Sequence, residues 1–187
     1  DEGGAEARGL DALRDEFARI DGLADKRGIP ALLAHLRSIG AAVPLNLFID
    51  QDARDSSRYA VYLNQGGLGL PDRDYYLKDD DAKLRGVRAE YLQHVRRMLA
   101  MAGEKDAERA AQAILALETG LARAQWTKVE NRDPVKTYNK TEFARLPALV
   151  AGYDWNVYFA AAGVGNKADY AIVRQPSFFA AFGTLLG

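Results

Sequence analysis

Two long amphipathic patterns in the middle of the sequence, separated by a very short connection, constrain the fold more than any other feature. Apolar residues recur at three- and four-residue steps from Asp79 to Gly103, and the pattern resumes from Asp106 to Trp126. Only Gly103-Glu104-Lys105 joins the two stretches. Because so short a connection makes consecutive helices neighbours, we expect two long antiparallel helices over about 79–126. We expect Trp126 in the core near their end.

A change of period upstream of these helices predicts strands. The segments "VPLNLFID" and "RYAVYLNQ" alternate apolar and other residues with a period of two, and they are rich in β-branched and aromatic side chains. The intervening "QDARDSS" consists mostly of turn formers. We therefore expect one antiparallel hairpin over about 43–64, which pairs Val43–Asp50 with Arg58–Asn64. Since a lone hairpin is only marginally stable in water, it must pack against the helices.

Shorter patterns complete the chain, and "ADYAIVRQ" reads as an extended segment. The shorter helices are expected at about Ala5–Leu23, at Pro30–Ser38, at Thr141–Arg145, after a capping Asp154, and from Pro176 onward. A chain of 187 residues fits one domain with a sizeable core. The predicted fold class is mainly α: a single helical domain over residues 1–187, with long antiparallel helices and one β-hairpin.

Composition argues against several kinds of partner and site. A formal net charge of -1 gives no electrostatic reason to expect nucleic acid or an acidic membrane surface. Without cysteine there are neither disulfides nor thiolate metal sites. No apolar run approaches the ~20 residues of a membrane span. The sequence shows no signal peptide or initial Met, and both ends look cut. We therefore expect a piece of a longer protein; the alternative is a processed mature chain with a packed C-terminal helix.

The residues alone do not point to a catalytic centre. The only histidines are His35 and His94, and there is no H-E-x-x-H or G-x-S-x-G motif. Glu90 and His94 stand four residues apart on one helix face and could bind a metal together, but a catalytic zinc needs a third protein ligand. A solvated Glu–His pair explains them better. Each pair of neighbouring carboxylates has an explanation as a helix cap or a turn.

The stretch "GGLGLPDRDYY", Gly66 to Tyr76, is the most concentrated motif in the chain. It lacks the Lys-Ser or Lys-Thr of a phosphate loop and the G-x-G-x-x-G spacing. Its glycines and proline shape the backbone, and its Arg, Asp and Tyr side chains can satisfy loop groups. The segment "NRDP", Asn131–Pro134, repeats this composition. We predict structural roles in corners of the fold for Gly67, Gly69, Pro71, Arg73, Asp74, Tyr75, Tyr76, Asn131, Arg132, Asp133 and Pro134.

The same motif closely resembles the G-L-G-L-P-x-R-D-Y-Y motif of the neprilysin / endothelin-converting-enzyme family of zinc metallopeptidases. Four further blocks resemble family segments in the same order: "LFIDQDARDSSRYAVYLNQ", "ENRDPVKTYNKTEFARLP", "YDWNVYFAAAGV" and "IVRQPSFFAAFGTLL". The resemblance covers nearly the whole chain and is clearest from about Leu47 to Leu186. Animal members use disulfides, so this cysteine-free chain resembles a bacterial member.

This resemblance implies that the chain is the largely helical N-terminal region, which caps a central cavity in the family. The family's zinc ligands, on H-E-x-x-H and a later Glu-bearing helix, lie in its C-terminal half, as does its Asn-Ala-(Tyr/Phe)-Tyr motif. None of these motifs is present in the sequence. The resemblance therefore assigns no catalytic or metal residue here. Arg73 and Arg132 are the candidates to face the cavity.

The resemblance leads us to expect the non-catalytic cap or lid of a neprilysin-like zinc metalloendopeptidase that is periplasmic or secreted. The parent protein would hold zinc and hydrolyse short peptides, whereas this fragment alone would bind no zinc and be inactive. Its partners would be the missing C-terminal catalytic domain and peptide substrates. There would be no nucleic-acid partner and no membrane span in this segment. Two alternatives stay open: a free-standing helical binding module derived from the cap, and an independent metal enzyme that uses Glu90 and His94.

Overall fold

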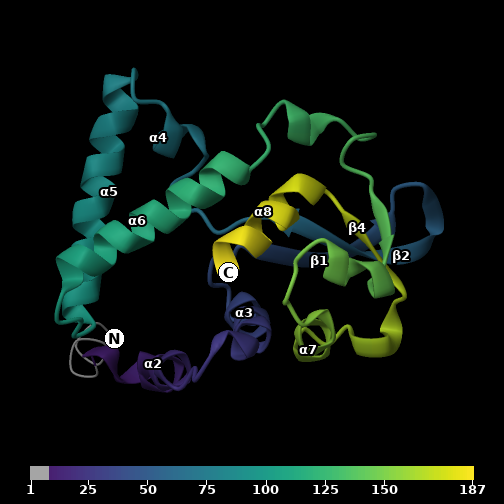
Figure 1. The fold of residues 1–187 in the computed structure, drawn as a ribbon, viewed down its shortest axis with the longest axis horizontal. Helices are drawn as coiled ribbons and strands as arrows, with labels where there is room; N and C mark the ends of the chain where they lie inside the picture. The colour runs from purple at the N-terminus through teal and green to yellow at the C-terminus, as the bar shows by residue number, and fades with distance from the viewer. Residues whose placement is uncertain (1–8) are drawn as a thin grey trace, which may run out of the picture.

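The computed structural model describes residues 9–187, in which several helices pack beside a small sheet (Figure 1). The helical elements are η1 (Gly9–Leu13), α2 (Arg14–Asp21), η2 (Lys26–Gly28), α3 (Ile29–Ser38), α4 (Asp74–Leu77), α5 (Ala82–Met101), α6 (Ala107–Ala124), η3 (Glu130–Arg132), η4 (Phe143–Ala148), α7 (Trp155–Ala161), η5 (Gly165–Lys167) and α8 (Pro176–Leu186). The strands are β1 (Leu45–Asp52), β2 (Asp55–Gln65), β3 (Lys140–Glu142) and β4 (Tyr170–Val173). The mainly α prediction is confirmed. The first four residues of the predicted helix at Ala5–Leu23 lie outside the described residues.

The predicted single hairpin is only half of the sheet. Strands β1 and β2 pair antiparallel, as expected, but the sheet has four strands in the order β1-β2-β4-β3. Strand β4 pairs parallel to β2, and β3 pairs antiparallel to β4. The helix predicted at Thr141–Arg145 was wrong in its first part, since Thr141 lies in β3 and the helical turn begins at Phe143. The sheet thus joins segments more than a hundred residues apart, which local periodicity does not reveal.

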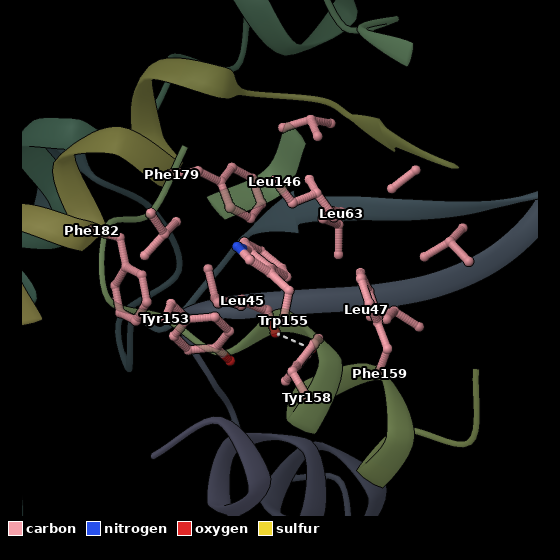
Figure 2. Packing of buried hydrophobic residues seen from close by; sticks show 14 of the residues in the cluster. Leu45, Leu47, Leu63, Leu146, Tyr153, Trp155, Tyr158, Phe159, Phe179 and Phe182 are labelled. Atoms are coloured by element: carbon pink, nitrogen blue, oxygen red, sulfur yellow. Dashed lines mark hydrogen bonds between the residues drawn. The ribbon is translucent and has the colours of Figure 1, made fainter. Parts of the chain in front are cut away.

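One face of the sheet carries the main core, which is rich in aromatic side chains (Figure 2). Leu45, Leu47 and Leu63 project from β1 and β2 into this cluster. Helices α7 and α8 cover them with the buried rings of Trp155, Tyr158, Phe159, Phe178, Phe179 and Phe182. Because these helices supply large apolar side chains, their burial is the main source of stability for the body of the fold.

The opposite face of the sheet holds a smaller cluster beside a buried carboxylate. Asp52, at the end of β1, is only 2% exposed. Its two carboxylate oxygens accept hydrogen bonds from the hydroxyls of Tyr138 and Tyr170, both at 2.8 Å, and from the backbone amide of Arg54 at 2.9 Å. Asp52 therefore connects the turn of the hairpin to β4 and to the segment before β3.

Side-chain caps and one glycine set the limits of the long helices. Asp81 accepts hydrogen bonds from the amides of Lys83 and Leu84 and begins α5, as the acidic run predicted. Gly103 has a φ of +88°, a left-handed conformation that favours glycine, and it ends the same helix. The expected cap at Asp154 is also present, accepting from the amide of Val157 at 3.0 Å.

The arrangement of the two long helices differs from the expectation. In Figure 1, α5 and α6 meet at their connection and diverge toward the other end, where α4 lies between them and contacts both. Antiparallel packing along their whole length is therefore not confirmed. The expectation for Trp126 was wrong, because its side chain is half-buried rather than in the core. Its indole N–H instead donates to the Ser177 hydroxyl at 2.7 Å.

Candidate functional site

The first glycines of the motif pass directly against the start of the hairpin. A Cβ atom on Gly66 would lie 2.6 Å from the Val43 carbonyl oxygen. Gly67 has a φ of +82°, and a Cβ there would lie 2.8 Å from the Cα of Pro44. Both contacts are with backbone atoms that side-chain motion cannot relieve, so only glycine fits this crossing. The glycines thus allow the chain leaving β2 to pass over the chain entering β1.

The centre of the motif is held by a carboxylate from α6, that of Glu118. One of its oxygens accepts from the Gly69 amide at 3.1 Å and from the Tyr91 hydroxyl at 3.0 Å, and the other accepts from the Tyr76 hydroxyl at 3.0 Å. The Tyr76 hydroxyl also accepts from the Leu70 amide at 2.9 Å. Burial, with the Glu118 charge adding to it, raises the pKa of Tyr91 to about 12, and burial likewise raises that of Tyr76. Both phenols therefore stay protonated and can donate to Glu118.

We expect Gly69→Ala to destabilise the chain by about 1–3 kcal/mol, because the new methyl group overpacks the corner. A Cβ on Gly69 would lie 2.0 Å from the Tyr91 hydroxyl oxygen, so the phenol must move away from Glu118. Urea unfolding followed by circular dichroism measures the change.

The matched control is Gly86→Ala in the exposed part of α5, where nothing lies within 4 Å of an added Cβ. This variant should be neutral or more stable, by up to about 1 kcal/mol, since alanine is the better helix former. Equal effects of the two substitutions would contradict the close contact between Gly69 and Tyr91.

The second half of the motif forms α4 and ties it to α6. The Nε atom of Arg73 donates to the Ala122 carbonyl oxygen at 3.1 Å. Asp74 pairs with Lys78 at 2.7 Å. Tyr75 and Tyr76 pack with Leu70 and Ala122 in a small apolar cluster, whereas Pro71 is exposed. The predicted motif residues therefore lie where α4 separates the two long helices.

Asp72, between Pro71 and Arg73, also makes definite contacts. Its carboxylate accepts from the Asp74 amide at 2.7 Å and pairs with Lys128 at 2.7 Å. Burial raises the pKa of Asp72, but the Lys128 ammonium and the Asp74 amide outweigh it, so that the pKa lies below its usual value. The motif is thus linked to the segment that follows α6.

The "NRDP" segment forms η3 and the turn after it. Asp133 accepts from the amides of Val135 and Lys136 at 2.9 and 3.0 Å, and these two bonds hold the pKa of Asp133 below its usual value. Arg132 and Pro134 are exposed and line a cavity of about 330 Å³ between the segment and the hairpin. Arg73 is not among the residues that line this cavity.

A network of carboxamide side chains joins the two motifs. The Gln65 side chain accepts from the Trp126 amide at 2.8 Å and donates to the Trp126 carbonyl oxygen at 3.1 Å. Gln175, which is 1% exposed, accepts from the Gln65 amide at 3.0 Å and donates to the Asn131 side chain at 2.8 Å. Sequence reasoning did not single out either glutamine. No periodic pattern or motif marks a pair of glutamines 110 residues apart.

A second cavity, of about 340 Å³, opens between this network and the glycine turn. Gly67, Pro71, Asn131 and Arg174 are among its lining residues. Asn131 and Arg174 also line the cavity beside Arg132, so both motifs border adjoining hollows. We call the cavity of about 340 Å³ the glycine-turn cavity. The motifs that were singled out separately in the sequence thus meet around one polar region of the surface.

Potential metal ligands do not cluster among the described residues. Over residues 9–187, no group of three or more His, Asp or Glu side chains is placed to hold a metal ion. Glu90 and His94 are both exposed on α5. This donor set does not fit a catalytic zinc, which requires three protein ligands. Within the same residues, no helix combines the length and the apolar character needed to cross a membrane.

Comparisons with known proteins agree with the resemblance read from the motifs. The sequence model Peptidase_M13_N, described as "Peptidase family M13", matches residues 1–187. Endothelin-converting enzyme-like 1 from Rattus norvegicus is 32% identical over 144 residues, which cover 73% of this chain and 18% of the relative. Endothelin-converting enzyme 1 from Cavia porcellus is 29% identical over 147 residues, covering 75% of this chain and 19% of the relative.

Solved structures have the same fold over the whole chain. The crystal structure of the zinc metalloprotease Zmp1 from Mycobacterium tuberculosis, in complex with an inhibitor, superposes with a TM-score of 0.93 at 36% identity. It covers 100% of this chain, which corresponds to 28% of that protein. PepO from Lactobacillus rhamnosis, at 17% identity and a TM-score of 0.74, shows a similar fold. The match covers 97% of this chain and 29% of the PepO chain. The chain therefore spans less than a third of the proteins it matches.

Proposed function

The chain belongs to peptidase family M13, and we propose that it forms the non-catalytic cap of a zinc metalloendopeptidase. The observation that carries the proposal is the superposition of the whole chain on 28% of a zinc metalloprotease. Residues 9–187 contain no group of side chains that could hold the zinc. The metal, and the water that it activates for attack on the peptide bond, would then belong to another part of the longer protein.

In this proposal the chain acts by shape rather than by chemistry. The aromatic core packs against the sheet, and Glu118 ties α4, α5 and α6 to one another. A rigid wall over a catalytic chamber excludes folded proteins and admits short, extended peptides. The partners are the catalytic part of the same protein and these peptides. The proposed location is the periplasm or the extracellular space.

The structural roles that we propose for the motif residues follow from their contacts. Gly67 and Gly69 allow close crossings, Arg73 and Asp74 fix α4, and Asn131 with Asp133 shapes the turn after α6. Arg132 is the better candidate to face the chamber, because its side chain is exposed and lines a cavity.

The reading frame beyond Gly187 provides a direct test of the proposal. We expect it to encode an H-E-x-x-H motif and, further along, a glutamate on a second helix, which together would hold the zinc. Sequencing the gene checks this expectation. A stop codon shortly after Gly187 would contradict the cap proposal and would support a free-standing binding module instead.

A further inference from the structure

We propose that Arg174 and the carboxamides of the glycine-turn cavity form a binding site for a carboxylate group. Among the described residues that line this cavity of about 340 Å³, Arg174 is the one that is ionisable. The other polar side chains on its wall are the carboxamides of Asn64, Gln65, Gln125, Asn131 and Gln175. A hollow with one fixed positive charge and several amide donors suits a small anionic group.

The backbone fixes the position of Arg174, while its guanidinium is left with unused donors. Its amide donates to the Leu63 carbonyl oxygen at 3.0 Å, which holds the residue at the end of β4. Its side chain makes one long contact, 3.4 Å, with the Asn131 carbonyl oxygen. Throughout residues 9–187, no carboxylate lies within ion-pair distance of this half-buried guanidinium. Because arginine keeps its charge, an incoming carboxylate would gain a strong partner there.

Asn64 is a further polar side chain on the wall of this cavity. Its side-chain oxygen is buried and has no hydrogen-bond partner in the described part of the chain. Gln65, Gln125, Asn131 and Gln175, in contrast, all bond to protein groups. An anion beside Arg174 would also lie near Asn64, which lines the same cavity.

The geometry favours a carboxylate over a phosphate. A carboxylate matches the planar fork of a single guanidinium and balances its one charge. A phosphate at neutral pH would bring more charge than this cavity offsets, since no lysine lines it. The neighbouring cavity, which Arg174 also lines, adds one acidic residue, Asp50, and one basic residue, Arg132. The carboxylate can come from the free end of a peptide or from an Asp or Glu side chain, and the test separates these sources.

Titrations of the ¹⁵N-labelled 187-residue chain, followed by NMR, test the site with three small probes. N-acetylglycine offers a main-chain carboxylate, acetyl-Ala-Asp-Ala-amide offers a side-chain carboxylate, and N-acetylglycine amide offers none. We expect one or both carboxylate probes to shift the amide signals of residues 64–68 and the Nε–H signal of Arg174. The neutral probe should leave them unchanged. Which carboxylate probe binds more tightly identifies the source.

Variants of the chain show whether the probes bind at this cavity or respond to the overall charge of the protein. Arg174→Gln should weaken the binding by about tenfold or more, because it removes a charge-assisted pair. Asn64→Asp should weaken it similarly by placing a negative charge in the cavity. The matched control is Arg97→Gln, an exposed arginine on α5, which should bind like the parent chain.

Three results would overturn the proposal. The first is no shift of these signals with either carboxylate probe, and the second is that the neutral probe shifts them as much as the carboxylate probes do. The third is that a folded Arg174→Gln variant binds the carboxylate probes as tightly as the parent chain. Circular dichroism establishes that each variant is folded. Arg174→Lys, which keeps the positive charge but lacks the planar guanidinium, should also bind the carboxylate probes more weakly. Zinc and peptidase activity play no part in the measurement. Its outcome is therefore independent of the proposed cap function.

Discussion

Replacing Asp52 with alanine should lower the free energy of unfolding by about 3–5 kcal/mol, since hydrogen bonds to a charged group are worth about 1.5–3 kcal/mol each and are not fully additive. The substitution removes a buried carboxylate that accepts from Tyr138, Tyr170 and the amide of Arg54. It leaves two phenolic hydroxyls and one amide without their acceptor next to the sheet. Urea unfolding monitored by circular dichroism and by tyrosine fluorescence measures the loss.

The neighbouring Asp50 provides a matched control. It lies two residues earlier on the same strand and is exposed, and within residues 9–187 its side chain accepts only from the amide of Gln51, at 2.8 Å. Asp50→Ala should therefore change stability by no more than about 0.5 kcal/mol, as surface substitutions usually do. A loss below 1 kcal/mol for Asp52→Ala would contradict the network that joins the hairpin turn to β4.

The contribution of Asp52 should also depend on pH. Burial raises its pKa, but hydrogen bonds from the Arg54 amide, Tyr170 and Tyr138 outweigh burial, so the pKa in the folded state lies below the ordinary value of 3.8. A carboxyl with a lowered pKa stabilises the fold above its unfolded pKa and loses this contribution as pH falls through the folded pKa. The stability difference between the parent chain and Asp52→Asn should thus be constant near neutrality. It should shrink below about pH 4.

Phe179→Ala should cost about 3–5 kcal/mol, the range for large aromatic truncations in cores. Its ring is 0% exposed and lies in the cluster between α8 and the sheet (Figure 2), where its centroid is 6.3 Å from that of Trp155. The truncation leaves a cavity that neighbouring rings cannot fill without leaving their own contacts. Chemical denaturation followed by tryptophan fluorescence reports on this cluster directly.

On the same helix, Leu185 is 40% exposed and provides the comparison. Leu185→Ala should cost about 1 kcal/mol or less, because Leu185 is partly exposed to solvent whereas Phe179 is fully buried. Similar losses for the two variants would mean that α8 does not pack on the sheet as described.

Local signals in the sequence predicted the elements well where one physical cause acts within a few residues. The alternation in "VPLNLFID" and "RYAVYLNQ" identified the two strands, because each strand has a face in the core. Asp81 and Gly103 marked the ends of α5, because capping depends on neighbouring backbone groups. The short connection after Gly103 correctly implied that α5 and α6 are neighbours, although it did not determine how they diverge.

The parts that could not be predicted depend on contacts between distant residues. The parallel pairing of β4 with β2 joins Ala171 to Val61, and a four-residue apolar run does not specify its partner. Glu118 looked like one of several polar residues on a helix, yet it accepts from both tyrosines at the corner. A corner was predicted at the glycine motif, but nothing in the sequence indicated that Glu118 of another helix contacts it.

Zinc content and cleavage of a short fluorogenic peptide test the central claim most directly, when they are measured in parallel on the 187-residue chain and on the gene product extended beyond Gly187. We predict that the extended product holds zinc, cleaves the peptide and loses activity to a chelator. The 187-residue chain should keep no stoichiometric zinc after dialysis and should not cleave. Zinc-dependent cleavage by the purified 187-residue chain, or an extended product without peptidase activity, would contradict the account.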